Sequence, residues 1–309
     1  MIEYNRFSWW RNTFSWRGTA LPLALPRILI ATTFCLLFEA VYELGLYEKL
    51  VDPKFFQGFD PLAHSVLGSL IGFLIVFRMN ASNARYWEGR SLWGQLINCS
   101  RNLVRTGSEH SPRGEELAGL TAGFAICLRR NLRGFRDTEE TELYLAPEVR
   151  DEAERFGNPP SAIAGAISSW IAQEARWGVL NPQMVRHLES VLGQMVDAQG
   201  GCEKIQKTPL PFAYVAMIKQ LIFVYLGTLP LLICPRFGWW SPLIMATVSL
   251  GMLGLEEASV EIEDPFGTHP NCLDLESYCL TITRDTAQLA LSAKRRREHA
   301  LADAKIPTN

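Results

Sequence analysis

The sequence lacks the residue patterns of most enzymes and metal proteins. It contains no H-E-x-x-H, no G-x-S-x-G, no phosphate-binding loop and no G-x-G-x-x-G, and its 5 histidines show no metal-ligand spacing. Its 7 cysteines contain no C-x-x-C and no paired spacing, which is typical of a reducing compartment. Residues 1–20 have no uninterrupted apolar core and no small-residue cleavage site, so we expect no signal peptide. We therefore expect no catalytic residues, no cofactor and no metal.

Charge is scarce as well. Charged residues make up 20% of the chain and hydrophobic residues 48%, and the mean hydropathy is +0.04. That hydropathy is too high for a typical soluble protein and too low for a chain lying wholly in lipid. The net charge of −2 gives no indication of nucleic-acid binding. With 16 Phe, 9 Trp and 8 Tyr, the chain is not disordered, so the composition predicts a protein partly embedded in a membrane.

Four apolar segments in two pairs predict membrane helices. They cover residues 21–46, 62–77, 212–234 and 237–255. The second segment has no charged residue, but a helix of its length spans about 24 Å, less than the ~30 Å of a hydrocarbon core. Each segment is short or carries charge, so we expect a bundle in which polar groups face protein or water. The alternative is a buried helical core of a soluble protein.

The distribution of Lys and Arg predicts the orientation of these segments. The connections 47–61 and 235–236 hold two and one, whereas residues 78–207 hold sixteen. The positive-inside bias then places both termini and the long middle region in the cytoplasm. We expect a membrane part at about 21–80 and 212–257, and a cytosolic part at about 1–20, 81–211 and 258–309.

The middle region is predicted to be helical. Apolar residues recur at spacings of three to five, at Leu92, Leu96 and Leu103 and again from Leu117 to Leu128. Breaks are expected at Ser111-Pro112, Pro147, Asn158-Pro159-Pro160 and Asn181-Pro182, the last of which also fits a capped helix start. Strand alternation is scarce, so the predicted fold class is all-α.

Charged residues near the apolar segments admit two interpretations. Acidic residues cluster at the end of the fourth segment, at Glu256, Glu257, Glu261, Glu263 and Asp264. Such a cluster can be catalytic or metal-binding, but a polar boundary is the commoner meaning. Lys219 lies inside the third segment and needs a partner, for which Glu39 or Glu43 is predicted.

Residues 77–94, FRMNASNARYWEGRSLWG, strongly resemble the signature of the bestrophin family. Further matches follow in order along the chain, at 15–19, 209–214 and 261–267. The signature residues are Arg85, Trp87, Glu88, Gly89, Arg90 and Trp93, with Pro265, Phe266 and Gly267 in the last match. We expect these residues to serve architecture, with Glu88 paired to Arg85 and the Trp rings locking cytosolic helices together. The short C-terminal tail resembles that of a bacterial member.

The resemblance implies a homopentamer with four transmembrane helices per subunit around one axial pore. It places Ser69, Phe73 and Phe77 in a narrow neck and Leu210 in a second constriction, the aperture. Rings of Phe can gate by dewetting, and their electropositive edges tolerate an anion. Plain core packing of Phe73 and Phe77 is the alternative.

Calcium activation is not expected. Animal members bind calcium with acids just after the Pro-Phe-Gly motif, whereas this chain continues from Thr268 to Asp274 with one acid. Whether Asp264 and Asp274 keep a weak site stays open.

The predicted function is conduction of monovalent anions, chloride first, across a bacterial inner membrane, with membrane lipid, permeant ions and four further copies as partners. A channel for cations such as sodium is the first alternative, because acidic residues lie near the pore and the net charge is negative. A non-conducting scaffold or an enzyme built around Glu256–Asp264 is the second.

Overall fold

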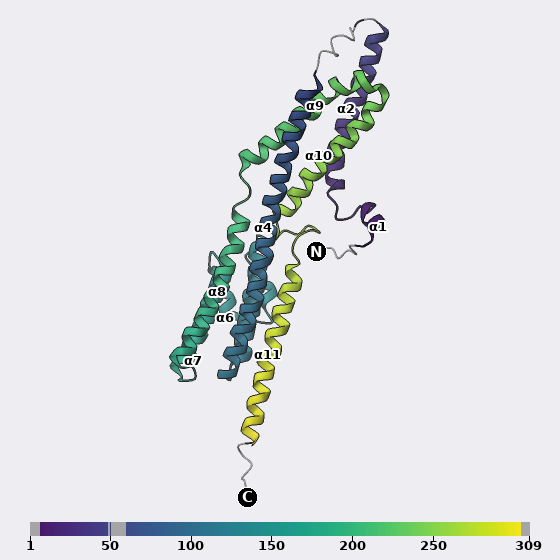
Figure 1. Cartoon of the computed structure of the whole chain (residues 1–309). Helices are drawn as coiled ribbons and strands as arrows, with labels where there is room; N and C mark the ends of the chain where they lie inside the picture. The colour runs from purple at the N-terminus through teal and green to yellow at the C-terminus, as the bar shows by residue number, and fades with distance from the viewer. Residues whose placement is uncertain (1–6, 49, 51–59, 304–309) are drawn as a thin grey trace. The chain divides into compact units, whose positions relative to one another are not determined.

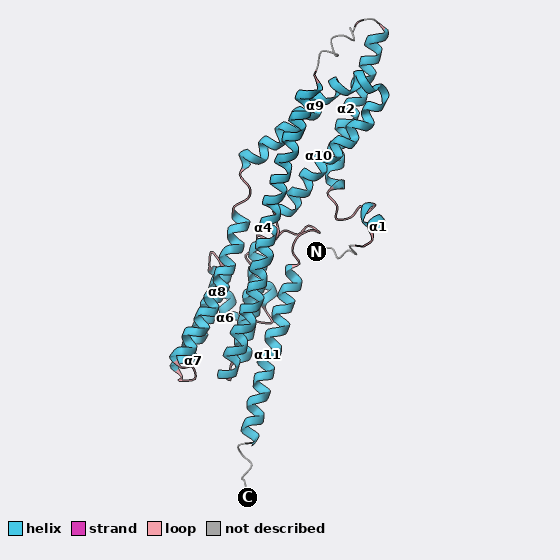
Figure 2. Ribbon diagram, in the orientation of Figure 1, coloured by secondary structure: helices cyan, strands magenta, loops and turns pink. Residues whose placement is uncertain are grey.

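The computed structural model describes residues 7–48, 50 and 60–303, and the described residues form helices and turns without a strand (Figure 2). The predicted all-α fold class is thereby confirmed. The chain divides into two units. The first comprises Met1–Tyr86, Pro209–Asp264 and His269–Cys272, and the second Trp87–Thr208, Pro265–Thr268 and Leu273–Asn309.

The first unit contains the four apolar segments, each on its own helix (Figure 1). After the short α1 come α2, the first part of α4, α9, the 3-10 turn η2 and α10. Their bounds are Trp9–Thr13, Leu21–Tyr47, Pro61–His110, Phe212–Phe237, Gly238–Trp240 and Ser241–Glu263. Among the described residues, three continuous helical stretches are long and apolar enough to cross a membrane, namely α2, α4 and the stretch Phe212–Glu263 that holds α9 and α10.

The core of the first unit lies between α2, α4, α9 and α10. Buried residues from all four helices pack together, among them Ile28, Ile71, Ile222 and Met245. Gly238 makes the turn from α9 to α10 at a φ of +54°, a backbone conformation that favours glycine. The helices therefore bury one side against each other and leave many large apolar side chains exposed.

The helix α4 is continuous over 50 residues, and this was not predicted. The sequence predicts a membrane part that ends at about residue 80 and a cytosolic helical part that begins at about residue 81, without joining the two in one helix. No proline lies between Pro61 and Pro112, so nothing in the chain breaks the helix, which is about 75 Å long. It ends just before Ser111-Pro112, where a break was expected.

The second unit holds the rest of α4 with α5, η1, α6, α7, α8 and α11. Their bounds are Gly114–Leu132, Glu139–Thr141, Pro147–Arg155, Pro159–Arg176, Pro182–Lys207 and Leu275–Asp303. Asn181 Oδ1 accepts a hydrogen bond from the Met184 amide at 2.9 Å, which confirms the predicted cap. Of the apolar residues predicted for helix faces, Leu92 is half-buried and the others, from Leu96 to Leu128, are buried. The helix α5 packs against α7 and α11 to form this core.

Candidate functional site

The exposed face of α4 carries the three residues predicted to line a neck. Ser69, Phe73 and Phe77 recur every four residues and are exposed, the two rings to 65% and 64%. The opposite face packs into the core of the first unit through Ile71 and Ile75, which are 0% and 3% exposed. The Phe rings are therefore not core residues of this chain.

Polar residues lie on both sides of the two Phe rings along this face. Asn80 is exposed and follows Ser69 by eleven residues, about 20° more than three full turns. Phe73 and Phe77 stand between them, about 6 Å apart along the axis. The Ser69 hydroxyl donates to the Ser65 carbonyl at 2.9 Å, one turn back. A short apolar band with a polar residue at each end thus runs along one side of the helix.

Arg78, the residue after Phe77, points about 100° away from it around the helix and is buried. Its side chain is 2% exposed, and Nη1 lies 2.5 Å from Oε1 of Glu256 on α10. Nη2 lies 3.4 Å from Oε2 of Glu263, which follows Glu256 by seven residues, or about two helical turns. A buried charge of this kind is stable only when it is paired and hydrogen-bonded, so these contacts fix the side of α4 that faces α10.

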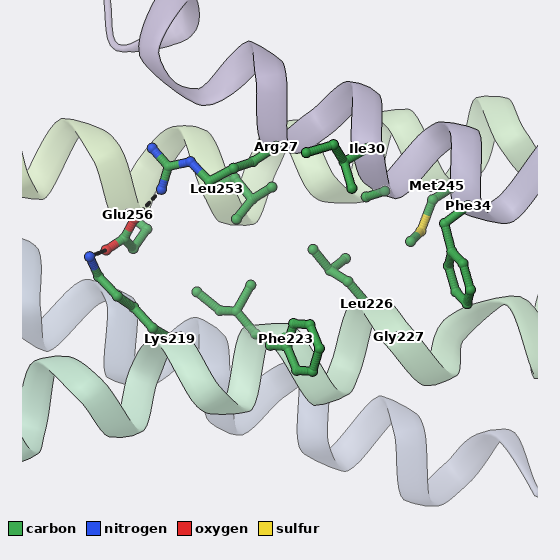
Figure 3. A pocket seen from close by; sticks show the side chains of 12 residues that line it. Arg27, Ile30, Phe34, Lys219, Phe223, Leu226, Gly227, Met245, Leu253 and Glu256 are labelled. Atoms are coloured by element: carbon green, nitrogen blue, oxygen red, sulfur yellow. Dashed lines mark hydrogen bonds and ion pairs between the residues drawn. The ribbon is translucent and has the colours of Figure 1, made fainter.

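Glu256 is the centre of a larger charged network. Besides Arg78, Arg27 Nη1 lies 3.4 Å from Oε2 and Lys219 Nζ lies 3.6 Å from Oε1 (Figure 3). Arg27 also pairs with Glu257. The predicted partners of Lys219, which were Glu39 and Glu43, are wrong, because the nearest carboxylate is Glu256. The polar-boundary interpretation of the acidic cluster fits this network.

Leu210, the predicted aperture residue, is attached to the same network. It lies in the connection from α8 to α9, and its amide donates to Oε1 of Glu263 at 3.1 Å. The signature residue Arg85 donates from Nε to the carbonyl of Glu263 at 3.1 Å. Glu263 therefore joins the connection at Leu210 to α4 at two points, Arg78 and Arg85.

In the second unit, two distant parts of the signature contact each other. A Cβ at position 89 would lie 3.0 Å from Cζ of Phe266 and 3.4 Å from Cγ of Pro265. Gly89 is thus the residue that admits the Pro-Phe-Gly motif against α4, and a side chain there would require Phe266 to move. Pro265 and Phe266 are buried and Gly267 is half-buried.

The tryptophans of the signature differ in their surroundings. Trp93 is fully buried, with its ring centroid 6.0 Å from that of Tyr278 on α11, and the Arg90 guanidinium lies 4.9 Å above the Tyr278 ring. Trp93 thus joins α4 to α11 within the second unit. Trp87, by contrast, is 60% exposed, and its predicted role stays a prediction.

Ion pairs hold the rest of the signature in place. Glu88 pairs with Lys204 of α8 at 2.8 Å, which supplies a partner that the sequence did not indicate. Arg133 donates from Nε to the Phe266 carbonyl at 3.4 Å and pairs with Glu276 of α11. The guanidinium holds the pKa of the Glu276 carboxyl below its usual value of 4.5.

The loop after the Pro-Phe-Gly motif is held by hydrogen bonds of its own. The Asp274 carboxylate accepts from the Ser277 amide at 3.1 Å and caps α11. Asn271 Nδ2 donates to the Gly18 carbonyl at 3.0 Å and to Glu261 at 2.5 Å. The carboxylate of Asp274, one of the two acids considered for calcium, is thus hydrogen-bonded to the start of α11.

Comparisons with known proteins decide the family. The family described as "Bacterial/Fungal Bestrophin protein" matches residues 1–288. The chain belongs to the bestrophin family. This confirms the resemblance of residues 77–94, and the chain is a bestrophin over almost its whole length.

Curated relatives of this bestrophin carry channel names. "Voltage-dependent anion channel-forming protein alr2987" of Nostoc sp. is 30% identical over 308 residues, which are 96% of each chain. "Voltage-dependent anion channel-forming protein YneE" of Escherichia coli K12 is 32% identical over 292 residues, 94% of each chain. The crystal structure of a bacterial bestrophin homolog from Klebsiella pneumoniae is similar with a TM-score of 0.78 and 25% identity, over 86% of this chain and 98% of the other.

The sequence did not identify the central pair of the network, Arg78 and Glu256. Both residues were visible as charges at the ends of apolar segments, and a charge in that position needs a partner. The signal that could have paired them is depth. Arg78 directly follows the second segment and Glu256 directly follows the fourth, and these two segments run in the same direction because one segment separates them along the chain.

Proposed function

We propose that this bestrophin is a homopentameric channel that conducts monovalent anions, chloride first, across a bacterial inner membrane. The names of the curated relatives support an anion channel. In the proposed arrangement α2, α4, α9 and α10 cross the membrane and both termini are cytoplasmic. The membrane part is then about 21–80 and 212–257, and the cytosolic part about 1–20, 81–211 and 258–309.

The observation that carries the proposal is the exposed face of α4. Five copies around one axis would place Ser69, Phe73 and Phe77 in three successive rings. The Phe rings are two-thirds exposed in the single chain, so they are available to line a pore. An apolar band between polar residues excludes water when narrow, and the positive edges of the rings tolerate a passing anion.

Leu210 is proposed as the aperture. Prolines at 209 and 211 restrict the backbone on each side, and the bond from the Leu210 amide to Glu263 holds the residue between them. A ring of five leucines held in this way would discriminate among anions by size. It would leave opening and closing to the neck.

The network around Glu256 favours anions over cations. The sodium alternative relied on acids near the pore, but Glu256 and Glu257 are paired with Arg27, Arg78 and Lys219. Paired acids contribute little net field to a passing cation. The family and the relatives' names also point to a channel and not to an enzyme or a scaffold.

Calcium activation is not part of the proposal. The Asp274 carboxylate caps α11, and calcium takes six to eight oxygen ligands. Activation by another stimulus, such as voltage, is compatible with this arrangement.

The reversal potential of purified protein in planar bilayers tests the proposal. Under a potassium chloride gradient, an anion channel reverses near the chloride equilibrium potential and a cation channel near that of potassium. Light scattering in mild detergent should give a protein mass of five chains. A monomer or dimer in several detergents, or reversal at the potassium potential, would contradict the proposal.

A further inference from the structure

A groove between α2, α9 and α10 has the features of a lipid site. It has a volume of about 510 Å³, within the range of small-molecule sites. Its floor is apolar and includes Ile222 and Met245, while Phe34 and Phe223 stand exposed at its sides. The charged residues Arg27, Lys219 and Glu256 lie together at one end (Figure 3).

The charged end lies at one level of the helices. Arg27 is six residues after the start of α2, Lys219 seven after the start of α9, and Glu256 seven before the end of α10. At ~1.5 Å per residue, each is about 10 Å from a helix end that the proposed topology places at the cytoplasmic face. This is the depth at which lipid headgroups meet acyl chains.

The apolar end continues from there toward the middle of the membrane. Phe34 lies seven residues beyond Arg27, Gly227 eight beyond Lys219, and Met245 eleven before Glu256. These steps correspond to roughly 10–16 Å along the helices. The groove is thus as long as a large part of an acyl chain and runs in the direction of one.

Lys219 has only a long ion pair among the described residues and can accept a second anion. Its Nζ is 3.6 Å from Glu256 Oε1, too far for a hydrogen bond, and that oxygen already accepts from Arg78 at 2.5 Å. The described residues provide Lys219 with no hydrogen-bond acceptor, and its side chain is 53% exposed. Of the ionisable residues that line the groove, Arg27 and Lys219 are cations and Glu256 is an acid; Arg27 is also paired with Glu257, so Lys219 is the less neutralised of the two cations.

A neighbouring copy is poorly suited to supply this anion. Within the described apolar helices, the acids at this level are Glu256 and Glu257, which are already paired with cations. Glu39 and Glu43 lie 12 and 16 residues beyond Arg27, roughly 18–24 Å away along α2. A lipid phosphate carries both the charge and an attached apolar chain.

We infer that this groove binds one anionic phospholipid, with its phosphate on Arg27 and Lys219 and one acyl chain along α9. The inference uses the membrane placement in the proposed function but does not depend on conduction. Lipid binding can be measured without current, so either proposal can fail while the other stands.

Photolabelling of the full chain tests the site. Protein in nanodiscs receives a phosphatidylglycerol with a photoreactive acyl chain, or the phosphatidylcholine with the same chain, and labelled peptides are mapped by mass spectrometry. We expect phosphatidylglycerol to label α2 and α9 beside the groove and phosphatidylcholine to label them less. Lys219→Gln should weaken phosphatidylglycerol binding about fivefold, and Lys219→Arg should preserve it.

Two glycines provide a matched pair for the acyl chain. Gly227 lines the groove and Gly251 does not, and a Cβ at either position meets nothing within 4 Å. Gly227→Leu should therefore fold, fill the groove and reduce labelling by both lipids, whereas Gly251→Leu should label as the unchanged protein does.

Three outcomes would overturn the inference. The first is equal labelling of the groove by the two lipids, and the second is labelling that Gly227→Leu leaves unchanged. The third is that neither lipid labels the groove, while Phe223→Cys cross-links to a neighbouring copy. The last would assign the groove to a subunit interface.

Discussion

The buried pair of Arg78 and Glu256 can be tested by removing one charge and then both. Arg78→Met keeps an unbranched side chain of similar length and takes away the cation. It leaves the Glu256 carboxylate, whose side chain is 2% exposed, with partners at 3.4 and 3.6 Å in Arg27 and Lys219. A buried charge that loses its closest partner is strongly destabilising, because its hydration is not restored.

The expected magnitude separates this pair from a surface pair. Arg78→Met should lower the free energy of unfolding by about 3–5 kcal/mol, and Glu256→Met by a similar amount. The double variant should cost much less than the sum, because it buries no unpaired charge. If one kcal/mol corresponds to about 2–4 °C, each single variant lowers the unfolding midpoint by roughly 6–20 °C.

Tryptophan fluorescence of the purified protein during heating in one detergent measures these midpoints. Lys204→Met is the matched control, because Lys204 and Glu88 form an exposed pair at 2.8 Å with side chains 64% and 46% exposed. Its loss should cost at most about 1 kcal/mol. The pair does not stabilise the first unit if Arg78→Met lowers the unfolding midpoint no more than this control does. The same holds if the decreases of the two single variants add up in the double variant.

Three further predictions concern the pore and the second unit. Phe73→Ala and Phe77→Ala should each raise conductance or open probability in bilayers and shift the anion-to-cation ratio. Unchanged currents together with a loss of about 3–5 kcal/mol would mean core packing instead. Leu210→Ala should change the relative permeability of anions of different size and leave gating close to the unchanged protein; altered gating with unchanged size preference would exclude the aperture. Because Arg133 lowers the pKa of Glu276, that pair stabilises the folded chain above pH 4.5 and loses its contribution as the pH falls through the lowered pKa. Glu276→Gln should therefore reduce the decrease in the unfolding midpoint on acidification, and an unchanged pH profile would contradict this.

The helical framework was predictable because its signals are local. Four apolar segments, the scarcity of strand alternation and the Asn181-Pro182 start each depend on neighbouring residues, and each has its helix in the structure. The continuity of α4 was missed for a related reason. A change from apolar to amphipathic composition at Arg78 resembles a boundary, although no helix-breaking residue accompanies it.

The pairing of charges was less predictable because it depends on depth in a bundle. Glu39 and Glu43 were chosen for Lys219 by charge alone. Counting residues from the helix ends in the structure that the proposed topology places at the cytoplasmic face puts Lys219 seven residues inside α9 and Glu256 seven residues inside α10, but Glu39 eighteen inside α2. Depth would therefore have selected Glu256. The burial of Trp93 depends on α11, through Tyr278, and had no comparable signal in the sequence.

The buried pair also bears on the exposed face of α4, because consecutive helical residues point about 100° apart. With Arg78 held at 2.5 Å from Glu256, the helix has one rotation available, and in that rotation Phe77 and Phe73 face away from the core. Hydrophobic packing alone would select this rotation less strictly, since phenylalanine can be buried as readily as isoleucine. The double variant, Arg78→Met with Glu256→Met, therefore separates the effect on stability from the effect on the rotation of α4. It removes the unpaired charge and the stability penalty, but it also removes the contact that excludes a rotated α4. We therefore expect it to regain much of its unfolding midpoint while its conductance stays different from that of the unchanged protein, and full recovery of both would show that packing alone sets the rotation.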